Sequence, residues 1–590
     1  MQVINPKFSA TIIQRYFIEK SIELLHQQSN DSYRLRINNS ESILTELIEV
    51  CEDLKEGRLK NHDYAKLLAL ECKRTIDECD IIEFKTINKK FFGSLLEKIE
   101  KGKDDGYRTL IHAGRIILNE NQHLTSKVFQ EIARSLIKYS HYSSVDNAVL
   151  LKFGDLIHYF LIELVQHGYS KHYLGRFFSA IFTGVRGLSF LQRLIIIKEL
   201  INRKPENFNV IFGINTNLLS LSRIDINKPD ISNVTKRIKT RLINISNEKC
   251  LQFFENNSQH LLFLIKVSSR DYYDALLKAR NIFMKELDIL HLGYSNENFV
   301  LIEDCLLIGE LHPEKASVNS TNYKIDGFYR SRNSLYEFVL KRFNEIDQSK
   351  VTEESINKIY SGVRYLRIGS ESNEIESRFI NYWIGLEYLF SSSDASQYTI
   401  GRLREFFKNC HALIYFKRNL TEFHRDLKRM SLSEFIPNYS DDLQYLKDII
   451  TYQIITKKSS SPLLTQRAEY FRIRLAAPKD LRGTIERHKQ NVEWNLTRIY
   501  RIRNEIVHNA AIKSNIVTIT SHLRYYLTFI LNSIIDFLIQ NQDNLRLNNK
   551  LEIEDYFILQ NLKLNSFESI VDGINFENML TVHNPMEIFC

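Results

Sequence analysis

Six consecutive residues near the end of the chain combine two side chains that can act on a phosphodiester bond. The run Arg-Asn-Glu-Ile-Val-His occupies residues 503–508 of a 590-residue sequence. An arginine guanidinium binds phosphate oxygens, and a histidine imidazole changes its charge near neutral pH. Because RNA carries its own nucleophile, the 2′-hydroxyl group, these groups are the minimum needed to cleave RNA without a metal. The spacing indicates Arg503, Asn504 and His508 as candidate catalytic residues.

A long helix must position these three residues. Asp480 is a good N-terminal cap, and the pattern that follows predicts a helix over residues 480–508. Its apolar stripe consists of Leu496, Ile499, Ile502 and Ile506. On such a helix Arg503 and His508 lie about 140° apart, so one copy does not place them on one face. We therefore expect a second copy of the helix to complete the site.

A second helix, predicted over residues 374–390, carries an acidic residue in an unexpected place. Glu387 falls inside the apolar stripe of that helix, and Arg503 lies beside the stripe of the 480–508 helix. Burying either charge alone is very unfavourable. Either Glu387 and Arg503 face each other, so that the carboxylate orients the guanidinium, or each side chain reaches solvent separately.

Basic residues are frequent before and within the 480–508 helix, and aromatic residues are interleaved with them. The candidates for RNA binding are Arg472, Arg474, Arg482, Arg498 and Arg501. Cations suit the RNA backbone and aromatic rings suit stacking on bases. The alternative is an ordinary solvated helix face with buried aromatic residues, in which Arg501 forms an ion pair with Glu505.

These residues resemble a known family. The element from Arg503 to His508 resembles the R-x(4–6)-H signature of HEPN domains, and residues 379–390 are similar to the F-x-x-x-W-x-x-L-E-x-L helix of the ApeA-like HEPN group. The resemblance covers residues 351–545, about one third of the chain. It implies a compact helical bundle that dimerises through the helix carrying Arg503. The chain departs from the family pattern in a long insertion around residues 410–480.

The resemblance also implies an activity. Active members of the family are metal-independent endoribonucleases of anti-phage, abortive-infection and toxin systems. The implied substrate here is tRNA or mRNA, cut at a site shared by two copies, under the control of a phage-derived trigger or an antitoxin. An alternative is a non-catalytic HEPN module that binds a nucleotide or RNA or acts as a scaffold. A third interpretation is a sensor subunit whose partner performs the chemistry.

The fold expected for the whole chain is mainly α. It divides into a helical sensor or regulatory region, a small mixed unit with a linker, the HEPN-like bundle and a tail, at residues 1–250, 251–345, 351–545 and 546–590. The mixed unit is a strand–helix–strand pattern with strands at 261–267 and 299–302 and a helix at 271–290.

Composition excludes several function classes. The net charge of +8 over 590 residues is mild, so any RNA contact should come from a local patch. The 7 cysteines show no metal-ligand spacing, and no glycine-rich phosphate loop is present, so we expect neither a metal nor a cofactor. Apolar runs are too short for a membrane span, and the N-terminus lacks the pattern of a signal peptide. We expect a cytoplasmic protein.

Overall fold

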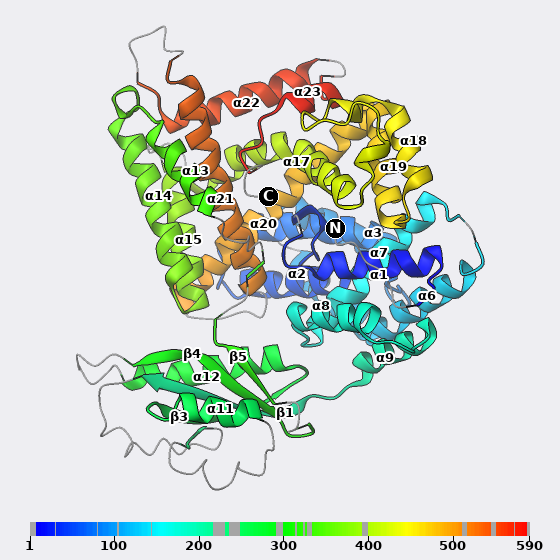
Figure 1. The fold of residues 1–590 in the computed structure, drawn as a ribbon, viewed down its shortest axis with the longest axis vertical. Coiled ribbons are helices and arrows are strands. Elements are labelled where there is room, and N and C mark those ends of the chain that lie inside the picture. Colours follow the sequence, from blue (N-terminus) through cyan, green and yellow to red (C-terminus); the bar gives the residue numbers. More distant parts are fainter. Residues whose placement is uncertain are drawn as a thin grey trace. The chain divides into compact units, whose positions relative to one another are not determined.

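The protein is mainly helical, with one small antiparallel sheet, as the sequence predicts (Figure 1). The computed structural model describes residues 8–29, 31–78, 81–102, 106–142, 144–215, 231–234, 248–290, 299–312, 316–322, 325–326, 333–391, 399–509, 516–543, 550–570 and 573–586. The chain forms two compact units. Unit 1 comprises residues 1–162 and 325–590, and unit 2 comprises residues 163–324.

Unit 1 is built from helices in the residues that the structure describes. Its N-terminal segment contains α1 (Ile12–Leu25), α2 (Ser40–Lys55), α3 (Asp63–Glu78), α4 (Lys89–Glu100), α5 (Tyr107–Glu120), α6 (Leu124–Lys138) and most of α7 (Asn147–Gln166). Its C-terminal segment contains α13 (Asn333–Asn344), α14 (Glu353–Glu371), α15 (Ile375–Leu389), α16 (Thr399–Arg402), α17 (Lys408–Arg429), α18 (Ile449–Lys458), α19 (Pro462–Ala476), α20 (Pro478–Asn509), α21 (Ile516–Asn541), α22 (Ile553–Ser569) and α23 (Phe576–Thr581). A π-helical turn, η8 (Leu403–Phe407), joins α16 to α17.

The helix α20 lies at the centre of the packing of unit 1. It contacts α15, α17, α19 and α21 of the C-terminal segment, and it also contacts α3 of the N-terminal segment. Its predicted apolar stripe is buried at Leu496, Ile499 and Ile502. Pro478 stands at its first position, where a residue without a backbone N–H costs nothing. The helix is therefore enclosed on more than one side, unlike a surface helix with a single buried stripe.

The N-terminal and C-terminal segments share a second buried contact. The Arg467 guanidinium on α19 pairs with Glu23 of α1 and, at 2.7 Å, with Asp426 of α17. It also lies 3.7 Å from the ring centroid of Tyr33. In addition, Ser461, the N-cap of α19, donates a hydrogen bond of 2.7 Å to Glu19 of α1. The first helix is thus fixed to the C-terminal segment by paired charges.

Unit 2 contains the sheet. Its elements are α8 (Lys171–Ser179), η3 (Ala180–Gly184), α9 (Phe190–Asn202), β1 (Glu206–Asn215), β2 (Ile231–Asn233), α11 (Glu248–Asn256), β3 (Leu261–Ser269), α12 (Tyr272–Leu290), β4 (Val300–Gly309) and β5 (Ser317–Ser320). The strand order is β2-β3-β1-β4-β5, and every pairing is antiparallel.

Alternate residues of β1 face opposite sides of the sheet, as strand geometry requires. Phe212 faces α12 and stacks on Phe283 with ring centroids 5.4 Å apart. Ile211 faces the other side, where it packs with Phe253 of α11. The strand–helix–strand pattern predicted from the sequence is present as β3, α12 and β4, with β1 inserted between the two strands.

The domain boundaries differ from those expected. The boundary expected at residue 250 falls inside unit 2, because β1 begins at Glu206 and pairs with both β3 and β4. The expected separation of residues 1–250 from the bundle at 351–545 is also not observed, since residues 1–162 belong to the same compact unit as residues 325–590. The tail expected at 546–590 contains α22 and α23, and both pack against α17. Long-range packing, to which local sequence patterns are insensitive, explains these differences.

Candidate active site

The candidate catalytic residues lie at the C-terminal end of α20. Arg503 and Asn504 are half-buried, and a guanidinium Nη1 of Arg503 donates a hydrogen bond of 3.0 Å to Oδ1 of Asn504. His508 lies on the same helix, one turn after Asn504, and its side chain is outside the described residues. The structure thus brings together the guanidinium and the amide.

The structure places Glu387 away from an ion pair with Arg503. Glu387 is on α15, and its Oε2 accepts a hydrogen bond of 2.7 Å from the indole N–H of Trp383. Trp383 is buried one turn earlier on the same helix, and a buried indole N–H needs an acceptor. The Trp383 ring in turn lies 5.7 Å from the ring of Tyr500 on α20. Of the two arrangements left open by the sequence, the direct Glu387–Arg503 pair is therefore not the one formed.

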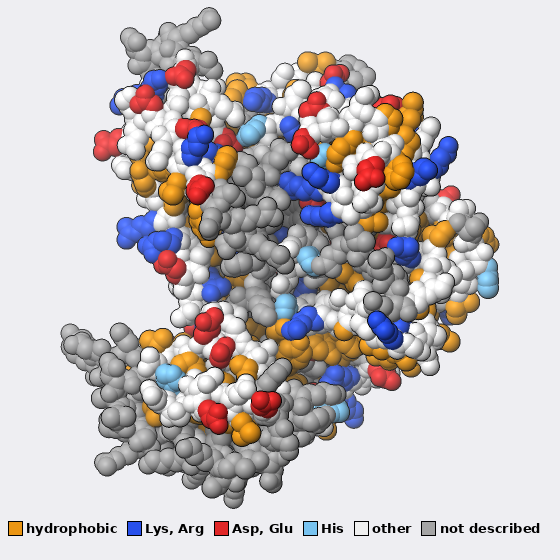
Figure 2. Space-filling view, in the orientation of Figure 1, with side chains coloured by type: hydrophobic (Ala, Val, Ile, Leu, Met, Phe, Trp, Pro, Cys, Tyr) orange, Lys and Arg blue, Asp and Glu red, His pale blue; other side chains and the backbone are white. Residues whose placement is uncertain are grey.

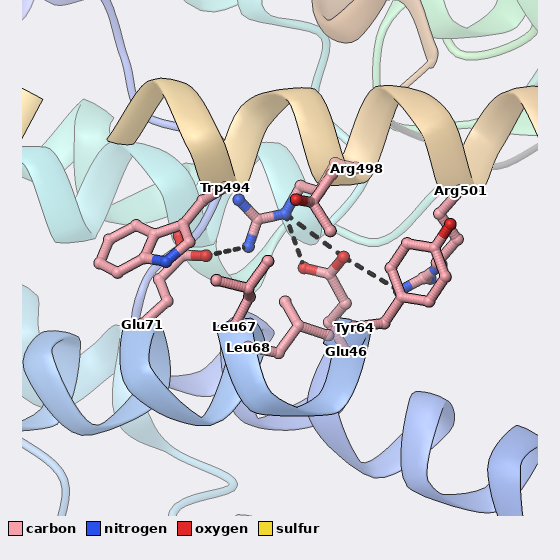
Figure 3. Close-up of a pocket in the computed structure, with 9 residues that line it drawn as sticks. Glu46, Tyr64, Leu67, Leu68, Glu71, Trp494, Arg498 and Arg501 are labelled. Atoms are coloured by element: carbon pink, nitrogen blue, oxygen red, sulfur yellow. Dashed lines mark hydrogen bonds and ion pairs between the residues drawn. The ribbon is translucent and has the colours of Figure 1, made fainter. Parts of the chain in front are cut away.

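Arg498 and Arg501, two of the expected RNA-binding residues, are buried ion-pair partners of the N-terminal helices (Figure 3). Arg498 contacts Glu46 of α2 at 3.0 Å and also pairs with Glu71 of α3. Arg501 contacts the same Glu46 at 3.1 Å and Glu505 at 2.9 Å. Because these guanidiniums are enclosed and already paired, they are not available to RNA in this arrangement.

The two acidic partners have pKa shifts of opposite sign. Burial favours a raised pKa for Glu46, but Arg498, Arg501 and a hydrogen bond from Asn38 outweigh it, so its pKa is lowered. For Glu71, burial is again the largest cause and it raises the pKa. The positive charge of Arg498 only partly opposes this effect, and the negative charge of Glu46 raises the pKa of Glu71 further. The pKa of Glu71 is therefore raised. Glu46 is the better compensated carboxylate of the two.

This ion-pair network lines a small cavity. The lining residues are Glu46, Tyr64, Leu67, Leu68, Glu71, Trp494, Thr497, Arg498 and Arg501. The cavity volume is about 10 Å³, which has room for roughly one water molecule. It is therefore a feature of the interface between α2, α3 and α20, and it is too small to hold a nucleotide.

The remaining three expected RNA-binding residues lie in different environments. Arg472 donates two hydrogen bonds of 2.6 Å to Glu469. Arg474 donates 2.9 Å hydrogen bonds to the Thr484 hydroxyl and to the backbone of Tyr470, and it lies 3.3 Å from the Tyr470 ring centroid. Arg482 is exposed. On the face drawn in Figure 2, basic side chains of unit 1 are likewise interspersed with acidic ones. The five arginines do not form one patch.

Sequence reasoning missed the acidic residues of α2 and α3 that contact α20. Glu46 and Arg498 are separated by 452 residues in the chain, and Glu71 and Arg498 by 427. No local spacing connects them, because the amphipathic pattern of α2 and α3 is that of any helix with a polar face. The sequence did contain one signal, the number of arginines on α20. Each arginine that is buried requires an acidic partner, so several arginines on one helix indicate acidic residues elsewhere in the chain.

Comparison with known proteins gives no relative: no protein-family model, curated protein or solved structure matches the chain. Among the described residues, no group of three or more His, Cys, Asp or Glu side chains is arranged to hold a metal ion. In the same part of the chain, no helix combines the length and the apolar character required to cross a membrane.

Proposed function

We propose that the chain is a HEPN-type, metal-independent endoribonuclease in which Arg503, Asn504 and His508 act on RNA. The proposal rests on one observation, that Arg503 has no acidic partner among the described residues. Three arginines occur between residues 498 and 503, and Arg498 and Arg501 are both paired with carboxylates. Arg503 hydrogen-bonds only a neutral amide, and no described carboxylate lies within ion-pair distance of it. A phosphate group would supply the missing anion.

The chemistry follows from the groups at the end of α20. His508 removes the proton of a ribose 2′-hydroxyl, whose oxygen attacks the adjacent phosphorus while the bond to the 5′-oxygen breaks. The histidine of a second copy protonates the leaving 5′-oxygen, which is why we propose a homodimer through α20. Arg503 faces the charge that grows on the phosphate oxygens, and one such donor contributes about 3–4 kcal/mol. The products are a 2′,3′-cyclic phosphate and a 5′-hydroxyl.

The N-terminal helices would restrain the enzyme. Glu46 and Glu71 pair with Arg498 and Arg501 of α20, which lie five and two residues before Arg503. A phage-derived trigger or the loss of an antitoxin would alter this contact and allow two copies to meet. The proposed setting is therefore the cytoplasm of a bacterial cell, with tRNA or mRNA as substrate.

The test uses cells that express the wild-type chain, Arg503→Ala or His508→Ala, with and without phage challenge. We expect new RNA 5′-hydroxyl ends in challenged wild-type cells and none with either variant. Arg367→Ala is the matched control, because Arg367 is an exposed arginine on α14 that pairs with Glu371 one turn away. A purified active sample should cut RNA in the presence of EDTA and leave DNA of the same sequence intact, since DNA lacks the nucleophile.

The alternative, a non-catalytic binding module, predicts a different result. RNA would remain intact in all strains after challenge, while the purified wild-type chain would still retain RNA. That combination would refute the nuclease and leave a binding role for Arg503.

A further inference from the structure

Aromatic and basic side chains lie together in unit 2 where the helices α8 and α12 begin. The carboxylate of Asp271, next to the start of α12, accepts hydrogen bonds of 2.6 and 3.0 Å from the backbone N–H and the hydroxyl of Ser170, the N-cap of α8. These bonds hold the first turns of the two helices against each other. We call the surface formed here the α8–α12 face, and its residues are His172, Tyr173, Arg176, Arg203, Arg270 and Tyr272.

The aromatic rings of the α8–α12 face contact one another and are only partly covered. The ring centroid of Tyr272 lies 5.7 Å from that of Tyr173 and 4.3 Å from that of Tyr273. The ring of His172 meets the ring of Tyr273 edge to face at 4.2 Å. Tyr273 is buried, whereas His172, Tyr173 and Tyr272 are half-buried. Three rings of one cluster therefore keep part of their surface in contact with solvent.

Three guanidinium groups accompany these rings. Arg176 is exposed, and its Nη1 donates a hydrogen bond of 2.7 Å to the Tyr273 hydroxyl. Arg203 donates a hydrogen bond of 3.4 Å to the Tyr173 hydroxyl. Arg270 donates to the backbone carbonyl of Arg203, and its guanidinium lies 5.9 Å from the ring centroid of Tyr169. Neutral groups thus hold Arg176 and Arg270 in place.

The acidic side chains near this face are already paired or capped. Glu206 lies 2.9 Å from Arg203, and Asp274 lies 2.6 Å from Lys278. Asp271 is buried and accepts the hydrogen bonds that cap α8 and α12. The carboxylates of this region are therefore accounted for by other partners.

Arg176 and Arg270 have no described carboxylate within ion-pair distance. A guanidinium binds a phosphate through two parallel hydrogen bonds, and an aromatic ring stacks on a nucleic-acid base. Single-stranded RNA offers both groups, because its bases are not paired. An acidic peptide would use the cations and leave the rings without a role.

We propose that the α8–α12 face binds single-stranded RNA, with Arg176 and Arg270 on phosphate groups and Tyr272 stacked on an unpaired base. The proposal rests on the proposed function only for the role of the bound strand as the substrate. Holding the strand on the chain that carries Arg503 raises the effective concentration of RNA for the groups at the end of α20.

The test measures binding separately from cleavage. The probe is a fluorescent, single-stranded RNA oligonucleotide in which every 2′-hydroxyl is methylated, so it has bases and phosphates but cannot be cut. Its affinity for the full chain is measured by anisotropy over a range of salt concentrations. The variants are Arg176→Gln, Arg270→Gln and Tyr272→Ala. The controls are Arg367→Gln and Tyr142→Ala, which remove an exposed arginine and an exposed tyrosine of unit 1.

We expect each of the two arginine variants to weaken binding and to reduce the slope of log K against log salt by about 0.7, the value for one lost phosphate contact in a single strand. Tyr272→Ala should weaken binding roughly 5- to 150-fold without changing the slope, because it removes an uncharged stacking surface. Both controls should bind as the wild type does.

Conservative variants separate a lost contact from a folding defect. Tyr272→Phe keeps the ring and should bind as the wild type does, and Arg176→Lys keeps the charge and should retain the wild-type slope. A double-stranded probe should bind more weakly than the single strand, because its bases are not available for stacking.

Two results would overturn the proposal. One is wild-type affinity and slope in both Arg176→Gln and Arg270→Gln. The other is a chain that does not bind the RNA probe but binds a polyglutamate peptide, with that binding lost in Arg176→Gln, which would assign the face to an acidic protein. Failure of the nuclease would appear elsewhere, as the absence of new RNA 5′-hydroxyl ends in challenged wild-type cells while the purified chain still binds the probe.

Discussion

Neutralising Glu46 should destabilise the protein far more than neutralising Glu71, although both carboxylates contact Arg498. Glu46→Gln leaves Arg498 and Arg501 without their shared anion in a site where Glu46 itself is only 17% exposed. Arg498 keeps Glu71 and Arg501 keeps Glu505, but each loses a charged hydrogen bond to Glu46. At about 1.5–3 kcal/mol for each such bond, we expect a cost of about 3–5 kcal/mol. Glu71→Gln removes a carboxylate whose pKa is raised, so the loss of its pairing is offset by the loss of its desolvation penalty. We expect a cost of about 1 kcal/mol, as for one hydrogen bond.

The assay is urea denaturation followed by tryptophan fluorescence. The chain has 2 tryptophans, and they report on the relevant region, because Trp383 contacts Tyr500 and Trp494 lines the cavity beside Glu71. The pH dependence gives an independent check. The lowered pKa of Glu46 means that its stabilisation is complete above its unfolded pKa and is lost as the pH falls through its folded pKa.

The raised pKa of Glu71 has the opposite consequence, since protonation of Glu71 favours the folded state. On acidification from neutral pH, Glu71 should therefore take up its proton first, without loss of stability, and the loss should begin only when Glu46 is protonated. In Glu46→Gln this acid-dependent loss should be smaller. A Glu71→Gln variant as unstable as Glu46→Gln would refute the assignment of Glu46 as the principal partner.

Three other substitutions test separate parts of the structure. Arg503→Ala should change the free energy of unfolding by only about 1 kcal/mol, because it loses one hydrogen bond to a neutral amide. RNA cleavage should disappear in the same variant. Circular dichroism measures the change in stability, and RNA sequencing measures cleavage. Gly483→Ala should stabilise α20 by up to about 1 kcal/mol, since nothing lies within 4 Å of the added methyl group. Gly369→Ala should destabilise the protein by about 1–3 kcal/mol, because its added methyl group would lie 2.5 Å from Tyr382. Thermal melts that rank the two variants otherwise would contradict the packing. Asp426→Asn should destabilise by about 1.5–3 kcal/mol, because Arg467 on α19 loses its charged hydrogen bond to Asp426 and keeps its pairing with Glu23. A melt unchanged from wild type would contradict that network.

The two helices that carry the candidate site could be predicted from local pattern alone. The helix expected over 480–508 is α20, Pro478–Asn509, and the one expected over 374–390 is α15, Ile375–Leu389. Caps and the 3.6-residue period are local properties, so they are readable in one stretch of sequence. The strand β1 was not predicted. It is stabilised as a strand by pairing with β3 and β4, which lie some 50 and 90 residues later in the sequence, so the residues of β1 alone do not indicate it.

The environment of the candidate site could not be predicted in the same way. The sequence pattern of α20 shows one apolar stripe, which suggests that the arginines on its other side face water. In the structure those arginines are buried by Glu46 and Glu71 from a segment more than 400 residues away. Charge pairing between distant helices depends on tertiary contacts, and a single sequence contains no local trace of them.

The interruption of unit 1 by unit 2 has a consequence during synthesis. Ribosomes add about 5–20 residues per second, so Glu46 leaves the ribosome on the order of half a minute to a minute and a half before Arg498, which is 452 residues later. During that interval α1 lacks α19 and α3 lacks α20, the C-terminal helices against which they pack. By the time the arginines of α20 are translated, however, their acidic partners have long been made. For the ion pairs that Glu46 and Glu71 form with α20, the acidic partner is therefore always made before the basic one.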